Sequence, residues 1–448
     1  MGIYEDCWKM IANCNNIASE YDKGIKALEV ESSRYRNPRP IKYLLLPHFY
    51  SSIDWENYRL FSQTMIGIAN KVIKAYLKDT HVQKFYSFDP LLHELIMAVP
   101  SNQCTLPCSR LDIIFRQSQP ILCEINCDGS AGMRKDLTVN RALLSLSPYH
   151  KLAQNYNLSY KNLISAQVSS YVQIYSQYSH QNMHDISALD ASPVVAIVNF
   201  RDANDFQENM LYVHEYSKHG INAILADPRD LVYYDDNLFF NGQKIDFVQK
   251  EVAESKLLKH RSDCEDFIKS ILQGTVCFIG SAYGKIIDDK AFFALLHSDI
   301  LNDKLTDKEK DFIKQYIPFT QCFKDDISLF NCVKESKNHY VLKSRDTYGG
   351  IDVLAGKMIC PDEWLSVIEP LWNTNYIAQE FIETGTSIYP YISADGFLQK
   401  DSFRITIGLF CYDGVLSGFY SRASKELLIN DYGANDFYLG NLYYADLA

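Results

Sequence analysis

The stretch "RLDIIFRQSQPILCEINCDGSAG", residues 110–132, decides the interpretation of this sequence. Its two halves alternate apolar and polar residues, which is typical of two strands joined by a turn. If the turn is centred on Ser118, Asp112 faces Glu124 and Arg110 faces Asn126. Like charges directly opposite each other destabilise a strand pair. The pattern therefore predicts that something positive lies between the two carboxylates.

The two faces of this hairpin are predicted to differ. One is apolar enough for a core and carries Leu111, Ile113, Cys123, Ile125 and Cys127. The other carries Arg, Asp, Glu and Asn. Oxygen ligands of this kind suit Mg²⁺, which takes one or two carboxylates together with substrate phosphates. From the hairpin alone, a solvated surface with ordinary charges is an equally good interpretation.

Cysteines near this hairpin raise the alternative of a zinc site. Cys104, Cys108, Cys123 and Cys127 form C-x₃-C twice, within the spacing of some structural zinc sites. However, Cys123 and Cys127 are expected on the apolar strand face, where a free cysteine packs as a small hydrophobic residue. We therefore favour a core role over zinc.

The bulk composition narrows the class of protein. The 448 residues carry a net charge of −11, which argues against a nucleic-acid partner, since such a partner needs a basic surface. No leader and no uninterrupted apolar membrane span is predicted. Twelve cysteines scattered through a long chain are typical of reduced thiols in a cytoplasmic protein.

The order of predicted elements indicates a mixed α/β fold. Helices are expected over residues 1–30, 55–77 and 150–180, and a strand over 39–50. Residues 193–228 read as strand, helix and strand, which indicates a parallel α/β unit. A small hairpin is expected to turn at Asn241-Gly242. Short strands follow at 340–344, 376–382 and 402–422.

Two further stretches are typical of a nucleotide site. In "YVLKSRDTYGGIDVLAG", residues 340–356, a strand delivers Lys343, and Arg345 and Gly349-Gly350 follow. Glycines allow backbone to approach phosphate, and cations add charge; an ordinary glycine-containing hairpin is the alternative. "YIAQEFIETG", residues 376–385, suits a strand that offers backbone groups to an adenine, or an ordinary amphipathic strand.

Hydrolase interpretations are weak. His214 and His219 are five residues apart, about 140° around a helix, so they cannot form the i, i+4 zinc pair of a metalloprotease. G-x-S-x-G is absent from the sequence.

Together these motifs resemble the circularly permuted ATP-grasp ligases, the group that includes the synthetase part of glutathionylspermidine synthase. The resemblance spans residues 40 to about 435, and it rests on the order and spacing of the motifs. Arg110-Leu111-Asp112 matches the family's R-x-D strand, and Glu124-Ile125-Asn126-Cys127-Asp128 matches its E-x-N-x-D strand. The resemblance implies that Asp112, Glu124 and Asn126 bind Mg²⁺, with two ions expected, and that Arg110 faces the reacting group.

The same resemblance assigns the nucleotide contacts. Lys290, before an apolar helix, and Lys343 would contact the phosphates of ATP, with Arg345, Gly349 and Gly350 in the lid loop. Gln379, Glu380, Phe381 and Ile382 would hold the adenine. Arg422, in "GFYSRAS", would reach the active site as a catalytic arginine together with Arg110 and Arg345.

Three regions and one activity are expected from this resemblance. Residues 1–190 would carry the metal-binding hairpin, 191–320 an additional parallel α/β subdomain, and 321–448 the lid and adenine hinge. The activity would be amide-bond formation between a small carboxylate and an amine through an acyl phosphate, with ADP released, and without nucleic-acid or membrane partners. A phosphotransferase on the same scaffold, a non-catalytic nucleotide-binding scaffold and a zinc-stabilised interaction domain are the alternatives.

The sequence also departs from this family. Related chains often have Lys-Pro where Lys343-Ser344 stands. Gly129 and Ala131 replace serines that contact the peptide in the glutathionylspermidine enzymes, with Ser130 between them. The peptide and polyamine substrates of those enzymes are therefore not carried over.

Overall fold

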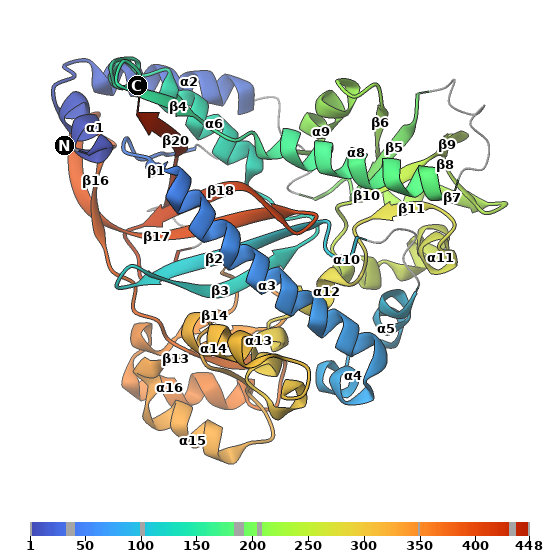
Figure 1. The fold of residues 1–448 in the computed structure, drawn as a ribbon. Coiled ribbons are helices and arrows are strands. Elements are labelled where there is room, and N and C mark those ends of the chain that lie inside the picture. Colours follow the sequence, from blue (N-terminus) through green and yellow to red (C-terminus); the bar gives the residue numbers. More distant parts are fainter. Residues whose placement is uncertain are drawn as a thin grey trace.

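The computed structural model describes residues 2–32, 41–98, 104–182, 192–203, 208–347, 350–429 and 436–446. In these ranges the chain is a mixed α/β protein with several separate sheets, which confirms the predicted class. A central antiparallel sheet lies between a parallel α/β region and a second antiparallel sheet (Figure 1). The site described below lies where these three parts meet.

The central sheet combines strands from distant parts of the chain. Its order is β19-β18-β17-β2-β3, with β16 pairing with β17. The strands are β2 (Cys108–Arg116), β3 (Gln119–Cys127), β16 (Ser387–Ile392), β17 (Leu398–Tyr412), β18 (Val415–Ser424) and β19 (Asp436–Leu439). The last predicted region thus supplies strands to the same sheet as the first. The predicted boundaries at residues 190 and 320 stay predictions.

The β2–β3 hairpin has the predicted register, but this register results from a β-bulge and not from the position of the turn. Its turn contains two residues, Gln117 and Ser118, both with positive φ, and Arg116 pairs with Gln119. A regular ladder from this turn would place Asp112 opposite Cys123. A β-bulge between Asp112 and Ile113 on one strand and Glu124 and Leu122 on the other leaves Cys123 unpaired. Such a bulge shifts the register by one residue, so Asp112 faces Glu124 and Arg110 faces Asn126.

The parallel α/β unit is confirmed. The parallel sheet has the order β11-β10-β5-β6, made of β5 (Val194–Val198), β6 (Asn222–Ala226), β10 (Phe247–Lys250) and β11 (Cys277–Ile279). Helix α9 (Glu208–Ser217) connects β5 to β6, and every residue of β5 is buried. Beside this sheet, β7 (Leu231–Tyr234), β8 (Asn237–Phe240) and β9 (Gln243–Ile245) form the predicted small hairpin region, with positive φ at Asn241 and Gly242.

The second antiparallel sheet carries the glycine-rich loop and the predicted hinge. Its order is β12-β15-β13-β14. The strands are β12 (Thr320–Cys322), β13 (Tyr340–Ser344), β14 (Val353–Ala355) and β15 (Tyr376–Glu380), and α15 (Ile327–Glu335) and α16 (Pro361–Ile368) belong to the same region. We call this sheet with its helices the lid region (Figure 1).

The long predicted helix is confirmed as α3 (Ser52–Lys78), which crosses the central sheet (Figure 1). Ser51 and Asp54 form a reciprocal capping box at its start. The helix predicted over residues 1–30 is two helices, α1 (Ile3–Ala12) and α2 (Ile17–Ser32). The strand expected over 39–50 was too long, since only β1 (His48–Tyr50) forms, in a sheet with β20 (Asn441–Asp446) and β4 (Tyr156–Ser159).

The other helices cover the sheets. They are α4 (Thr80–Tyr86), α5 (Pro90–Met97), α6 (Met133–Leu144), α7 (Ser147–Leu152), α8 (Leu163–Asn182), α10 (Glu254–Lys259), α11 (Glu265–Gln273), α12 (Gly284–Asp288), α13 (Ala291–Leu296) and α14 (Asp307–Tyr316). Residues 150–180 are therefore helical mainly as α8. None of the helices in the described ranges is long and apolar enough to cross a membrane.

Candidate active site

A cavity of about 470 Å³ lies between the central sheet, the lid region and the segments around residues 251–256 and 288–290. Most of the residues predicted for the site line this one cavity: Arg110, Asp112, Glu124, Asn126, Lys290, Lys343, Gly350, Gln379, Glu380, Phe381, Ile382 and Arg422. They come from strands β2, β3, β13, β15 and β18, from the start of α13, and from the segments that precede β14 and follow β15. The structure therefore brings together motifs that lie more than three hundred residues apart.

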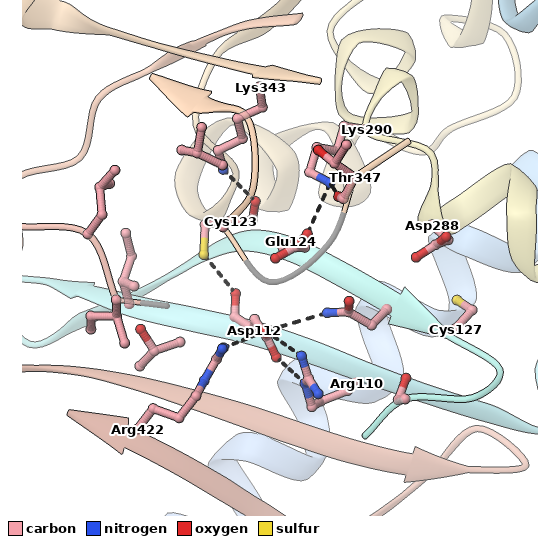
Figure 2. A pocket seen from close by; sticks show the side chains of 18 of the residues that line it. Arg110, Asp112, Cys123, Glu124, Cys127, Asp288, Lys290, Lys343, Thr347 and Arg422 are labelled. Atoms are coloured by element: carbon pink, nitrogen blue, oxygen red, sulfur yellow. Dashed lines mark hydrogen bonds and ion pairs between the residues drawn. The ribbon is translucent and has the colours of Figure 1, made fainter. Parts of the chain in front are cut away.

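Asp112 is the centre of a charge cluster on the floor of the cavity (Figure 2). Its two oxygens accept bonds of 2.7 and 3.0 Å from Arg110 and one of 2.9 Å from Arg422. The side-chain nitrogen of Asn126 lies 3.4 Å from Asp112 Oδ2. Asp112 is 1% exposed, and both arginines are 7% exposed. Two guanidinium groups thus share one carboxylate, leaving an excess positive charge.

A glycine makes room for this cluster. Gly408 on β17 pairs with Asp112 across the ladder. A Cβ atom at Gly408 would lie 2.7 Å from Arg110 Cδ and 3.0 Å from Asp112 Oδ1. Any larger residue there would displace the Arg110 side chain.

Glu124 and two lysines form the opposite wall (Figure 2). Lys290 Nζ lies 3.1 Å from Glu124 Oε1 and donates to the carbonyl of Thr347 at 2.6 Å. Lys343 Nζ donates to Gln379 Oε1 at 2.7 Å and to the carbonyl of Cys123 at 3.2 Å. Burial acts to raise the pKa of Glu124, but the charges of Lys290 and Lys343 outweigh it, so this pKa lies below its ordinary value. Burial lowers the pKa of Lys343.

The prediction that Cys123 lies on the apolar strand face is wrong. Because it is the extra residue of the bulge, its side chain turns to the cavity, and its thiol donates to the carbonyl of Asp112 at 3.2 Å. Burial raises the pKa of this thiol to about 11. Cys127 also lines the cavity while being 8% exposed. Leu111, Ile113 and Ile125 are buried on the apolar face, as predicted.

One end of the cavity is an apolar slot under the predicted hinge. Phe381 and Ile382 line it together with side chains from four other segments, namely Ile114, Pro318, Val341 and Val353. Gln379 is 1% exposed and joins Lys343 to Thr320 Oγ1, which it contacts at 3.0 Å. Glu380 pairs with Arg116 of the central sheet at 2.6 Å. The slot thus continues into the cationic part of the cavity through Lys343.

Of the predicted residues in the described ranges, Arg345 is not part of this lining. Arg345 is buried and points to Asp289, with two bonds of 2.8 Å, and to the carbonyl of Tyr86 at 3.0 Å. Gly349 lies outside the described residues, whereas Gly350 lines the cavity.

Sequence reasoning missed several residues of the cavity. Asp128, Glu251, Glu254 and Asp288 line the part beyond Glu124, where Lys250 pairs with Glu254 at 2.6 Å. Burial raises the pKa of Asp128 to about 7, and both of its oxygens are buried without a hydrogen-bond partner among the described residues. Asp128 directly follows β3 and has a positive φ, but it stands at the spacing of Glu124 and Asn126, so an alternating pattern extended by one step could have identified it.

Some of the side-chain oxygens on the floor of the cavity suit Mg²⁺ as ligands. Glu124 and Asn126 contribute oxygens facing the cavity, and oxygen is what Mg²⁺ prefers. Asp112 already accepts three guanidinium bonds and one from the Asn126 amide at 3.4 Å, and a carboxylate offers about four lone-pair positions. Among the described residues, His, Cys, Asp and Glu side chains do not form a group of three or more that could hold a metal ion. Glu124 and Asn126 therefore fit a ligand set, and Asp112 would join it only by sharing its oxygens with the arginines.

Comparisons with known proteins give structural likeness at low sequence identity. No family model matches the chain, and no curated protein matches it. A provisionally named gamma-glutamylcysteine synthetase of Methylobacillus flagellatus KT has 10% identity and a TM-score of 0.43, over 88% of this chain and 89% of that one. The RimK domain protein ATP-grasp of Sphaerobacter thermophilus has 15% identity and a TM-score of 0.28, over 56% and 90%.

A further similar structure is the D-alanyl-alanine synthetase A of Vibrio cholerae. It has 13% identity and a TM-score of 0.29, over 48% of this chain and 67% of that one.

Proposed function

We propose that this chain is an ATP-dependent ligase of the ATP-grasp type that joins a carboxylate to an amine and releases ADP and phosphate. One observation carries the proposal. Arg110, Arg422, Lys290 and Lys343 converge on one cavity that holds the carboxylates of Asp112 and Glu124. Around Asp112 and Glu124 these four cations face two carboxylates, which leaves a local excess of two positive charges that suits a polyphosphate and a second anion such as a carboxylate. The carboxylates of Asp128, Glu251, Glu254 and Asp288 line the part of the cavity beyond Glu124.

The nucleotide would lie along the line from the apolar slot to the lysines. Phe381, Ile382, Val341 and Val353 would enclose the adenine. Lys343 and Lys290 would contact the phosphates, and Lys290 would exchange its present contact with the Thr347 carbonyl for a phosphate oxygen. Transfer of a phosphoryl group needs positioning and charge stabilisation more than covalent chemistry from the protein. The absence of a serine or cysteine nucleophile from the motifs is consistent with this.

Arg110 and Arg422 would bind the carboxylate group of the acid substrate. Planar guanidinium groups bind carboxylates bidentately, and both are held in place by Asp112. They would neutralise the substrate carboxylate as it attacks the γ-phosphate and then the charge that develops on the acyl phosphate. The amine would then attack the acyl carbon, giving the amide and free phosphate.

Mg²⁺ would be held by Glu124 and Asn126, with Asp112 sharing an oxygen. When bound, it would supply positive charge that screens the β- and γ-phosphates. The circular permutation and the likeness to the synthetase part of glutathionylspermidine synthase are part of the same proposal. They are supported by the chain order, in which β2 and β3 precede the lid region and β17 and β18 follow it.

The decisive experiment measures ADP release from Mg-ATP over pooled carboxylic acids, with and without pooled amines. We expect ADP only when an acid and an amine are both present, and a large loss of release in Lys290→Met. ADP and a stable phosphorylated product with acid alone would replace the proposal with a phosphotransferase. Tight ATP binding without ADP under any pool would replace it with a nucleotide-binding scaffold.

A further inference from the structure

Arg345, directly after β13, makes a buried, fully engaged contact outside the lining of the cavity. Its Nε and one terminal nitrogen each lie 2.8 Å from an oxygen of Asp289, and the same terminal nitrogen donates to the carbonyl of Tyr86 at 3.0 Å. Arg345 is 7% exposed and Asp289 is 1% exposed. This one side chain therefore ties the lid region to the start of α13 and the end of α4.

The residues next to this pair continue the contact. The Lys290 backbone N–H lies 3.5 Å from the Arg345 carbonyl, and Lys290 Nζ donates to the Thr347 carbonyl at 2.6 Å. Asp346 pairs with Lys285 at 3.1 Å. Residues 345–347 thus close on residues 285–290 at several points, and we call this arrangement the clasp. Figure 2 shows Lys290 and Thr347 at its cavity end, beside Glu124.

We propose that Arg345 is a positioning residue that fixes Lys290 through Asp289, and not a group that contacts substrate. The proposal rests on the proposed function for the meaning of Lys290 as a phosphate contact. A lysine side chain is a flexible four-carbon stem carrying a point charge, so its backbone and its first contacts determine where that charge lies. The rigid fork of Arg345 on Asp289 holds the residue immediately before Lys290, and the Arg345 carbonyl faces the Lys290 N–H.

The side chain of Asp289 supports this interpretation, because Oδ1 also accepts the N–H of Ala291 at 2.8 Å. The carboxylate therefore sets the first turn of α13 from both sides of Lys290. Loss of the fork would release this turn from the lid region while leaving Lys290 itself unchanged. The clasp also explains why the guanidinium of Arg345 binds Asp289 and is not part of the cavity lining, although Lys343 two positions earlier is.

The first test measures the reactivity of Lys290 directly and does not depend on ATP. Arg345→Lys keeps the charge but removes the fork, which makes this substitution non-conservative at a bidentate site. We expect acetic anhydride to acylate Lys290 at least fivefold faster in Arg345→Lys than in the wild type, as followed by peptide mass spectrometry. Arg229→Lys is the matched control, since Arg229 binds Asp227 through the same two-nitrogen fork at 2.7 and 2.6 Å in the parallel α/β region. An unchanged Lys290 rate in Arg345→Lys overturns the inference.

The second test is a double-mutant cycle on ATP binding, with melting temperatures recorded for each variant. We expect Arg345→Lys to weaken Mg-ATP binding about tenfold in the wild-type background and less than twofold in the Lys290→Met background, because residues that act through one another are not additive. Equal losses in both backgrounds overturn the inference. If Arg345→Lys does not fold, the neutral pair Asp289→Asn with Arg345→Met replaces it. A wild-type chain that binds no ATP refutes the proposed function, while the acylation result still decides the role of Arg345.

Discussion

Asp112→Asn tests the charge cluster on the cavity floor. Asp112 accepts three guanidinium hydrogen bonds, of 2.7, 3.0 and 2.9 Å, at 1% exposure. Removing one partner of a buried ion pair costs about 3–5 kcal/mol because the remaining charge stays buried without compensation. Asparagine keeps one oxygen acceptor and nearly the same volume. We therefore expect the free energy of unfolding to fall by about 3 kcal/mol, the lower end of that range.

The assay is equilibrium unfolding in urea, followed by circular dichroism. Asp401→Asn is the control, because Asp401 pairs with Lys425 at 2.6 Å but its side chain is 47% exposed, and exposed pairs contribute only about 0–1 kcal/mol. A second measurement repeats the urea unfolding in the presence of pyrophosphate. The substitution raises the local cation excess around Asp112 and Glu124 from two to three, so pyrophosphate should stabilise Asp112→Asn more than the wild type. A variant as stable as Asp401→Asn, with the same response to pyrophosphate as the wild type, would refute this account of the cluster.

Three further predictions concern the same cavity. Arg422→Ala should leave the Kd for ATP within about threefold while turnover falls about a hundredfold, the loss typical of one transition-state contact; equal changes in both would contradict the assigned role. Gly408→Val should displace Arg110 and abolish turnover while the circular dichroism spectrum stays native, and an active variant would show that the close approach is not needed. Burial raises the pKa of Asp128 to about 7, so between about pH 4 and 7 the folded chain keeps a proton on Asp128 that the unfolded chain has lost, and the contribution of Asp128 to stability falls as the pH rises. Relative to Asp128→Asn, the wild type should therefore lose stability over this pH range, and urea unfolding free energies that change with pH in the same way for both chains would contradict the raised pKa.

The hairpin could be predicted because strand alternation is a local property. Arg110, Asp112, Glu124 and Asn126 share a face in any register that pairs the two acids, and the apolar residues between them then face the core. The route to that register could not be predicted. Gln117 and Ser118 both adopt positive φ without glycine, so neither the two-residue turn nor the compensating bulge at Cys123 has a sequence signal.

The remaining differences arise from contacts between distant segments. Arg345 directly follows β13, whose Lys343 lines the cavity, but Arg345 instead binds the carboxylate of Asp289, 56 positions away. Lys290 could be assigned only by resemblance, since its sequence surroundings predict no more than the start of an apolar helix. Its contacts with Glu124 and Thr347 depend on how three regions pack.

The order of strands in the central sheet has a consequence for synthesis of the chain. Asp112 and Arg422 are 310 positions apart, so at about 5–20 residues per second roughly 15–60 s separate their emergence from the ribosome. The lid region is translated within this interval and can complete its sheet from neighbouring strands. Meanwhile β2 still lacks β17, and its unpaired edge can pair with other nascent chains. The floor of the cavity is therefore completed late in synthesis, and the edge of the β2–β3 hairpin stays exposed to aggregation for most of the time that the chain is being made.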